Sequence, residues 1–374
     1  MAANNEKSKG QGILETVWVA LFVGILLLPL AFTPFRASSL KEMEKRALAP
    51  FPSLDNRYID YPKAIEDWYG DRFGLRGILI GSYRQARYQL GWLNASSSDA
   101  IRGLEGWHFL SWGGDSDPIL DHTGAIRFSD NELDRLEAYF ENWNRWLVDR
   151  GIDFYVLIAP NKVSVYPEFL PDGIESGPYG SRVNQLLDRL DSSSVSIVFP
   201  LEELKIEKEL AGPLYLKLDT HWNGMGAYYS YRAFFERSKL DRPLEEPRIR
   251  FVEKLRSEGD LVELLGVQSS RQDKDYGIEM LVENHPRLIG DWRFERGSAN
   301  RYENSDVDLG KAVIFHDSFM GPLIPLVARH MESSLFVYES QLDQSTIERE
   351  DPEVVILECV ERLLHGLLEA PLPE

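Results

Sequence analysis

Three residue types in this sequence match what acyl transfer to a serine hydroxyl requires. Asp219 stands two residues before His221 in the segment Leu216-Lys-Leu-Asp-Thr-His-Trp-Asn-Gly224. A carboxylate next to an imidazole fixes the tautomer of the ring and stabilises the imidazolium that forms. The segment holds no nucleophile, and Ser318, which ends His316-Asp-Ser318, is the candidate elsewhere in the chain. A Ser-His-Asp set assembled from these positions would perform acyl transfer or ester hydrolysis.

Each of these motifs also has an ordinary structural interpretation. A serine that follows a strand commonly caps the next helix, and an Asp-x-His pair by itself is frequent in proteins. Metal binding by Asp219, His221, His316 and Asp317 is a second alternative. The spacing of these four residues matches none of the familiar helical or paired-cysteine ligand patterns. The sequence therefore favours a site without a metal.

The segments that would position these residues alternate between strands and helices. Continuous apolar runs predict strands buried on both faces. Apolar residues at helical spacing, with Ser129-Asp-Asn-Glu132 as a capping box, predict helices. The predicted strands are 154–159, 195–199, 312–315, 335–338 and 353–357, with two short strands in 101–110, and the predicted helices lie in 64–93, 129–151, 182–190, 225–235, 319–331 and 359–368.

This alternation predicts an α/β fold with a parallel sheet between layers of helices. Ligands of such sheets bind beyond the carboxyl ends of the strands, and both Ser318 and the Asp219-x-His221 pair follow predicted strands. Ser318 would also lie at the turn into a helix, whose amide groups favour a developing oxyanion.

Composition excludes some classes of protein. The 374 residues are 43% hydrophobic, which is enough for one large domain or two modest ones. Acidic residues number 60 against 41 basic ones, for a net charge of -19, and no basic patch is present. A nucleic-acid binder is therefore not expected. Cys359 is the only cysteine, so an internal disulfide is excluded.

One stretch has the apolarity of a membrane span. Val17–Phe32 is apolar, and with Thr33-Pro-Phe35 it approaches the roughly 20 residues that a spanning helix needs. We expect an uncleaved anchor rather than a cleaved signal peptide, because Arg36 separates the run from the small residues 37–39. The basic residues on the two sides do not decide its orientation. The predicted organisation is a disordered N-terminus (1–12), an anchor (13–35), a linker (36–60) and a domain (61–368) with a possible inserted lobe or substrate loops (241–310).

The order of the motifs resembles a known family. Asp219-x-His221 with its following Asn-Gly and helix resembles the final block of SGNH-type esterases, and His316-Asp-Ser318 resembles their opening Gly-Asp-Ser block. The opening block comes last here, so the resemblance implies a circularly permuted SGNH-like sheet. In that numbering, strands 312–315, 335–338 and 353–357 are the first three, and 154–159 and 195–199 are the fourth and fifth.

This permuted order is similar to the alginate O-acetyltransferases of the AlgJ/AlgX type. The likeness covers most of residues 60–365 and includes Trp68-Tyr-Gly-Asp-Arg-Phe-Gly-Leu-Arg76, Ile101-Arg-Gly-x-x-Gly-Trp107, Pro160-Asn-Lys162, Tyr166-Pro-Glu-Phe-Leu-Pro171 and Glu358-x-x-Glu-Arg362. The resemblance implies that Ser318 is the nucleophile, His221 the general base and Asp219 its orienting acid. An acetyl group would then pass through Ser318 to a hydroxyl of an exported polysaccharide.

The resemblance also implies partners and a location. The chain would be anchored once in the inner membrane, with its amino end in the cytoplasm and its catalytic domain in the periplasm. A polytopic membrane O-acyltransferase would bring the acetyl group across. No cofactor is expected in the chain itself, since it has no Gly-rich nucleotide-binding loop.

The sequence departs from the family pattern at the oxyanion hole. His316 replaces the usual glycine, and the Gly-x-Asn-Asp block is replaced around Glu358–Arg362. The candidates for oxyanion or substrate contacts are the Ser318 amide and the side chains of Asn161, Arg362, Trp222 and His316. The acidic balance also favours a neutral glucan over a polyanion such as alginate as acceptor.

Two further functions stay open. An acetylesterase would use the same three residues with water as acceptor. A catalytically silent, anchored scaffold of a polysaccharide export complex would explain the unusual His316 and the missing oxyanion block.

Overall fold

The computed structural model describes residues 16–25, 49–52, 61–73, 75–90, 99–111, 116–178, 180–238, 247–267, 272–281, 285–294, 297–305, 307 and 309–374. The chain divides into two compact units, Met1–Leu93 and Asn94–Glu374. The helical residues 61–90, which the sequence analysis grouped with the domain 61–368, belong to the first unit.

The first unit is helical where it is described. Residues 16–25 form a helix, and the predicted helical stretch 64–93 is confirmed as α3 (Tyr61–Arg72) and α4 (Arg76–Gln89). None of the helices in the described part of the chain combines the length and apolarity needed to cross a membrane. The predicted disordered residues 1–12, most of the predicted anchor 13–35 and most of the linker 36–60 lie outside the described residues.

The second unit contains strands and helices in alternation. Its strands are β1 (Ala100–Arg102), β2 (His108–Leu110), β3 (Asp153–Ala159), β4 (Ser196–Val198), β5 (Ile249–Arg256), β6 (Asp273–Met280), β7 (Arg287–Phe294), β8 (Gly297–Glu303), β9 (Leu309–His316), β10 (Met331–Tyr338) and β11 (Val354–Val360). Its α-helices are α5 (Pro118–His122), α6 (Asp130–Val148), α7 (Lys162–Val165), α8 (Arg182–Arg189), α9 (Leu201–Ala211), α10 (Gly224–Arg237), α11 (Asp260–Leu265), α12 (Ile324–Ala328) and α13 (Gln344–Glu350). Short 3-10 helices span Leu104–Gly106, Pro167–Phe169, Ser318–Leu323 and Glu361–Glu369.

A seven-stranded sheet forms the centre of this unit, in the order β4-β3-β11-β9-β10-β8-β7. The pairs from β4 through β10 are parallel, and β8 and β7 extend the sheet in antiparallel pairing. In the numbering that the sequence analysis gave to β9, β10, β11, β3 and β4, the parallel strands lie in the order 2-1-3-4-5. That order places a topological switch point between β9 and β11, where doubly wound sheets bind ligands.

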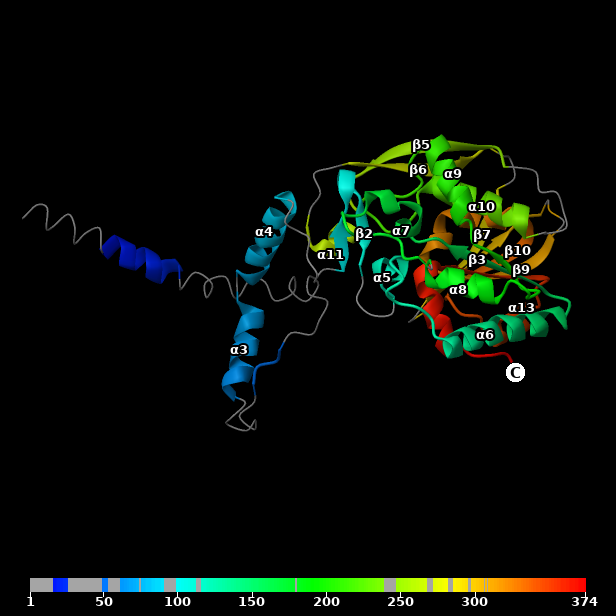
Figure 1. The fold of residues 1–374 in the computed structure, drawn as a ribbon, viewed down its shortest axis with the longest axis horizontal. Coiled ribbons are helices and arrows are strands. Elements are labelled where there is room, and N and C mark those ends of the chain that lie inside the picture. The colour runs from blue at the N-terminus through cyan, green and yellow to red at the C-terminus, as the bar shows by residue number, and fades with distance from the viewer. Residues whose placement is uncertain are drawn as a thin grey trace, which may run out of the picture. The chain divides into compact units, whose positions relative to one another are not determined.

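Helices cover both faces of the sheet (Figure 1). Successive residues of β3 alternate between them: Leu157 and Ala159 pack in the core beneath α9, α10 and α12, while Val156 and Ile158 pack in the core that contains α6, α8 and α13. All four are essentially unexposed. The strand is apolar throughout because both of its faces are buried, and the predicted α/β architecture is confirmed.

Helix α6 begins as the capping box predicts. The Ser129 side chain accepts from the Glu132 amide, and the Glu132 carboxylate accepts from the Ser129 amide at 2.7 Å. Each end of the box thus satisfies a backbone donor that the first helical turn leaves free.

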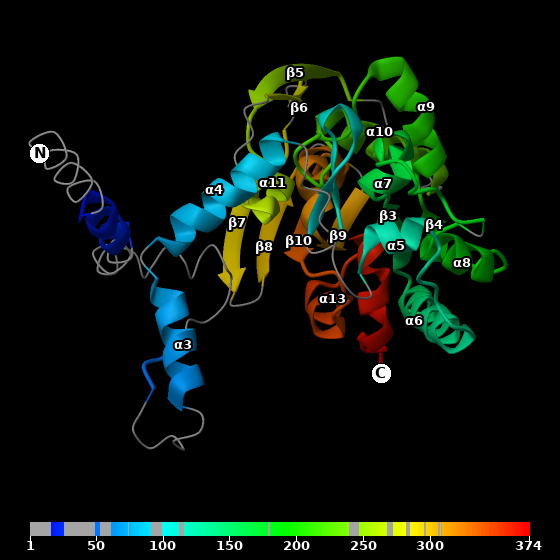
Figure 2. The ribbon, with the colours of Figure 1, turned by 60° about the vertical axis from the view of Figure 1, so that its left-hand side comes forward.

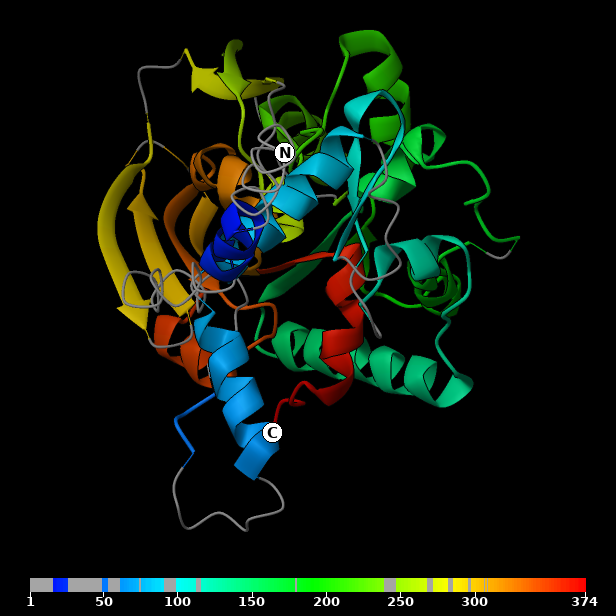
Figure 3. The ribbon, with the colours of Figure 1, turned by 90° about the vertical axis from the view of Figure 1, so that its left-hand side faces the viewer.

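Residues 241–310 are not one separate lobe where the structure describes them. Strands β7 and β8 join the edge of the central sheet, the long yellow strands on the left of Figure 3. Strands β5 and β6 instead pair only with each other and stand above the sheet in Figure 2. This region therefore contributes to two different parts of the unit.

Two helix predictions need correction. The predicted helix 319–331 is a 3-10 helix followed by α12, and β10 already begins at Met331. Pro322 and Pro325 cause this division, because proline lacks the amide that a continuous helix needs. The predicted helix 359–368 is a 3-10 helix that begins at Glu361, and Cys359 belongs to β11. Helices α5, α7, α9, α11 and α13 and strands β5 to β8 were not predicted.

Candidate active site

A tight loop carries Asp219 and His221 at its tip. Tyr215 and Trp222 form an isolated antiparallel bridge at its base. The Leu216 amide donates to the His221 carbonyl at 3.1 Å, and the Asn223 amide donates to the Leu214 carbonyl at 2.8 Å. These bonds close the backbone on itself, so the two side chains are held on a short, hydrogen-bonded turn.

The residues after His221 fix this loop to the rest of the unit. Asn223 caps α10, where its side-chain oxygen accepts from the amides of Met225 and Gly226 at 2.9 and 3.1 Å. A Cβ atom at Gly224 would collide with the Tyr276 carbonyl oxygen, so only glycine lets β6 lie against this helix end. The Asn-Gly pair of the sequence is thereby explained by packing.

Ser318 lies just beyond the carboxyl end of β9. Asp317 holds the turn: one carboxylate oxygen accepts from the Phe319 amide at 2.8 Å, and the other accepts from the Val360 amide at 2.7 Å. Because Val360 ends β11, the Asp317 side chain ties together the two strands that flank the switch point. The serine is thus placed where the fold is expected to bind ligands.

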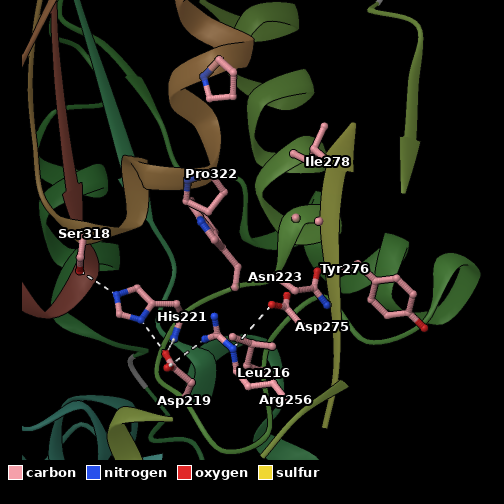
Figure 4. Close-up of a pocket in the computed structure, with 14 residues that line it drawn as sticks. Leu216, Asp219, His221, Asn223, Arg256, Asp275, Tyr276, Ile278, Ser318 and Pro322 are labelled. Atoms are coloured by element: carbon pink, nitrogen blue, oxygen red, sulfur yellow. Dashed lines mark hydrogen bonds and ion pairs between the residues drawn. The ribbon is translucent and has the colours of Figure 1, made fainter. Parts of the chain in front are cut away.

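The three residues singled out from the sequence meet in one line (Figure 4). Ser318 Oγ lies 2.7 Å from His221 Nε2, and His221 Nδ1 lies 2.6 Å from Asp219 Oδ1. An ionised carboxylate only accepts hydrogen bonds, so Nδ1 carries the proton and Nε2 is free to accept the Ser318 hydroxyl. The geometry is that of a nucleophile, a base and an orienting acid.

Asp219 is ionised over a wide pH range. Burial by itself would raise the pKa of its carboxyl, but hydrogen bonds from the His221 ring and amide and the nearby imidazole charge lower that pKa to about 2. The Asp260 amide contributes a further bond at 3.3 Å, and the Arg256 guanidinium lies 3.6 Å away. The carboxylate is therefore available to hold the imidazole at physiological pH.

Asp260 is a second carboxylate beside the same imidazole. It accepts from the Thr220 amide at 2.7 Å and from the Thr220 hydroxyl at 2.5 Å, while its Oδ2 lies 3.8 Å from His221 Nδ1. Among the described residues, Asp219, His221 and Asp260 bring ligand-type atoms within 4.8 Å of one another. Thr220 donates hydrogen bonds to Asp260, and the His221 ring donates one to Asp219.

Comparisons with known proteins relate part of this chain to acetyltransferases. A family model for the SGNH hydrolase-like domain of the acetyltransferase AlgX matches residues 100–285, which include Asp219 and His221 and end before Ser318. Two proteins named "Probable alginate O-acetylase AlgJ" are each 23% identical to this chain. The match to the protein from Pseudomonas syringae pv. tomato covers 64% of this chain, and the match to the protein from Pseudomonas aeruginosa covers 67%. Over these residues the chain is similar to the AlgJ/AlgX-type proteins.

The likeness to these family members is partial. The chain spans 56% of the length of the P. syringae AlgJ relative and 60% of the P. aeruginosa one. The solved O-acetyltransferase domain of Pseudomonas putida AlgJ has a TM-score of 0.48 and 17% identity, with 72% of this chain and 92% of that domain covered.

An open cleft of about 470 Å³ lies beside Ser318. Tyr276, Ile278, Pro322 and Pro325 are among the residues that line it, and Arg256 and Asp275 bring charge from β5 and β6. Arg256 Nε lies 3.7 Å from Asp275 Oδ2 (Figure 4). The sequence analysis did not single out these residues, since nothing in their spacing points to the serine.

Two other site candidates, Trp222 and His316, each have a ring nitrogen next to a backbone carbonyl, and Trp222 also lines the cleft. Trp222 is 1% exposed and donates its Nε1 proton to the Phe319 carbonyl at 2.9 Å, which secures the backbone after Ser318. His316 is buried with its Nδ1 2.7 Å from the Asp317 carbonyl oxygen, its ring against Phe336 and Tyr338. Neither ring nitrogen used in these contacts is available to a substrate.

Asn161 and Arg362 lie together on the other side of the loop. An Arg362 Nη atom donates to the Asn161 side-chain oxygen at 3.2 Å, and the guanidinium carbon lies 5.2 Å from the centre of the Phe319 ring. With Thr220 they line a small cavity. Phe319 in turn packs against the His221 ring, 4.8 Å between ring centres. Asn161 and Arg362 therefore lie close to Thr220 and Phe319, the chain neighbours of His221 and Ser318.

Glu358 lies directly beneath the serine turn. It is 0% exposed, one carboxyl oxygen accepts from the Asp317 amide at 3.2 Å, and its other oxygen finds no partner among the described residues. Burial, reinforced by the Asp317 charge, raises the pKa of this carboxyl well above its ordinary value of 4.5. Glu358 therefore keeps its proton to higher pH in the folded protein than in the unfolded chain.

We expect Glu358→Gln to stabilise the protein increasingly as pH rises. The unfolded chain loses the Glu358 proton above about pH 4.5, whereas the folded chain keeps it, so wild-type stability falls above that pH until the raised folded pKa is reached. Glutamine does not titrate. The difference in melting temperature between variant and wild type should grow between pH 4 and pH 8. A pH-independent difference for Glu358→Gln would show that the carboxyl ionises in the folded state.

Proposed function

We propose that this chain is a polysaccharide O-acetyltransferase in which Ser318 carries the acetyl group as an acyl-enzyme. The observation that supports this most directly is the 2.7 Å contact between Ser318 Oγ and His221 Nε2, in line with Asp219 and open to a cleft. The similarity to proteins named alginate O-acetylase supports the transferase class. The same similarity and the apolar stretch 13–35 support an anchored protein with its reaction at the periplasmic face of the inner membrane.

The first half-reaction acetylates Ser318. The hydroxyl gives its proton to His221 Nε2 while Oγ attacks the carbonyl carbon of the donor acetyl group. Asp219 stabilises the imidazolium, and the imidazolium returns the proton to the leaving oxygen as the tetrahedral intermediate collapses. The Ser318 amide and the Arg362 and Asn161 side chains are our candidates for stabilising the oxyanion.

The second half-reaction transfers the acetyl group. An acceptor hydroxyl in the cleft gives its proton to His221 Nε2 and attacks the acyl carbon, after which the proton returns to Ser318 Oγ. The donor is a carrier or a polytopic membrane O-acyltransferase rather than a nucleotide bound to this chain. Water in place of the sugar hydroxyl would make the protein an acetylesterase.

The charges of the cleft favour a neutral acceptor. Asp219 and Asp275 bring two carboxylates against the single guanidinium of Arg256, which lies within 4 Å of both. The neighbouring cavity adds Glu258, Asp260 and Glu263. A polyuronate would meet net negative charge at this site, whereas a neutral sugar can lie against Tyr276 and Ile278 without that repulsion.

The test is acetyl transfer from a chromogenic acetyl ester to oligosaccharides, followed by mass spectrometry of the sugars. We expect acetylated neutral glucan oligosaccharides, little product with oligouronates of equal length, and no product with Ser318→Ala. Ester cleavage without transfer to any sugar would identify an acetylesterase. Equal ester cleavage by wild type and Ser318→Ala would favour a scaffold, and preference for oligouronates would overturn the neutral acceptor.

A further inference from the structure

A buried lysine contacts the loop that carries Asp219 and His221. Lys162 is the first residue of α7, shortly after β3 ends at Ala159, and is 5% exposed. Its side chain runs beside Trp107 and Phe109, with Nζ 5.8 and 5.6 Å from the centres of their rings. The ammonium group therefore ends in the interior of the unit, where a charge is costly unless it is fully bonded.

The backbone of the loop supplies all of the partners that this ammonium needs. Lys162 Nζ donates to the carbonyl oxygens of Leu216, Lys217 and Asp219 at 2.9, 3.3 and 2.6 Å. An ammonium group has three donors and no acceptor. Every one of its N–H groups is thus directed to the five-residue stretch that ends just before His221.

The backbone amide groups of the same loop are bound by carboxylates. Asp273 of β6 accepts from the Lys217 amide and, at 3.3 Å, from the Leu218 amide. Asp260 accepts from the Thr220 amide at 2.7 Å. The carbonyl groups of the loop are therefore bound by one cation and its amide groups by two anions, which fixes both edges of its backbone.

The charged groups near the Lys162 ammonium include three carboxylates and one guanidinium. Burial lowers the pKa of the Lys162 ammonium to about 7, and the carboxylates of Asp260, Asp219 and Asp273 oppose that decrease. Arg362 lines the same small cavity as Lys162. The ammonium is held in this position by the loop carbonyls and these carboxylates together.

We propose that Lys162 is a positioning residue for acyl transfer, whose ammonium holds the loop carbonyls so that His221 points at Ser318. This inference rests on the proposed function, because the serine and imidazole are assigned there. It extends that function to a residue that touches neither the substrate nor the reacting atoms. The contact matters because a displacement of about 1 Å in a catalytic group lowers a rate by about 10²-fold.

The matched pair for the test is Lys162→Met and Lys208→Met. Lys208 is also a shielded lysine that donates to a backbone carbonyl, that of Val165 at 2.7 Å, but it pairs with Glu168 and makes no contact with the loop. Both variants lose a charge and keep an unbranched side chain. Ester turnover and the proton NMR signal of the His221–Asp219 hydrogen bond, far downfield of the amide region, are measured for each.

We expect Lys162→Met to lower kcat by about 10²-fold with KM changed less than about threefold, and to shift or remove the downfield signal. Lys208→Met should retain both, and Lys162→Arg, which keeps charge and donors, should recover part of kcat. If Lys162→Met does not fold, Lys162→Gln, which keeps two donors, is measured in its place with the same expected direction. Unchanged kcat and an unchanged signal in the folded variant would overturn the proposal. The NMR signal also separates this proposal from the proposed function. If the wild type shows no ester turnover but the signal is lost in Lys162→Met, the positioning role of Lys162 is supported and the acetyltransferase function is rejected.

Discussion

Replacing Ser318 with alanine is expected to lower kcat for acetyl-ester cleavage by a factor on the order of 10⁵–10⁶. The variant has no oxygen to receive the acetyl group, so only water activated in the cleft can react. Loss of the 2.7 Å bond to His221 should cost the fold only about 1 kcal/mol, because the imidazole is also held by Asp219. Ester hydrolysis and a melting curve for the same sample are the measurements.

Ser257→Ala is the control for this prediction. Ser257 lines the cavity next to the cleft together with Asp219 and Arg256. It is a serine of the same neighbourhood without a contact to His221, so its removal should leave kcat within about twofold of wild type. A Ser318→Ala variant that retains more than a tenth of the activity would show that Ser318 is not the nucleophile.

Replacing Asp219 with asparagine is expected to lower kcat by about 10⁴-fold. Asparagine is nearly isosteric, but its amide nitrogen would donate to His221 Nδ1 and so favour the tautomer that carries its proton on Nε2. That tautomer cannot accept the Ser318 proton. The acylation rate measured with a chromogenic ester reports the effect without an acceptor sugar.

Asp260→Asn tests whether position or charge matters at this imidazole. Asp260 Oδ2 is 3.8 Å from Nδ1, beyond hydrogen-bond distance, whereas Asp219 Oδ1 is at 2.6 Å. Asparagine at 260 can still accept from the Thr220 amide, so we expect a loss of at most about tenfold. Equal losses for the two variants would mean that the summed negative charge, rather than the bond to Asp219, sets the activity of His221.

The sequence was sufficient to predict the elements that depend on local pattern. The apolar run 154–159 predicts a strand buried on both faces, and the Ser129–Glu132 box predicts the start of α6, because each reflects contacts within one element. It also led to Asp219, His221 and Ser318, since their residue types and their order along the chain restrict the possible chemistry. Local pattern failed at 319–331, where two prolines divide the predicted helix.

Only the tertiary structure decided which polar groups surround the three residues. Arg256, Asp260 and Asp275 belong to a region whose sequence has no clear periodicity, and β5 and β6 pair with each other beside the cleft. Trp222 and His316 were candidates for substrate contacts by their type; the structure places Trp222 Nε1 on the Phe319 carbonyl and His316 Nδ1 beside the Asp317 carbonyl, and Trp222 lines the cleft. The bonds from Lys162 to the loop could not be predicted, because they connect residues more than fifty positions apart through backbone carbonyls.

The sequence by itself determined the parallel strands β3, β4, β9, β10 and β11, helices such as α6, α8 and α10, and the three chemically competent side chains, since residue type and spacing encode local geometry. The tertiary structure decided that the hydroxyl and the imidazole, 97 residues apart, lie at 2.7 Å. That contact depends on the order in which the parallel strands pair, and strand order is set by the packing of both sheet faces together rather than by any single segment.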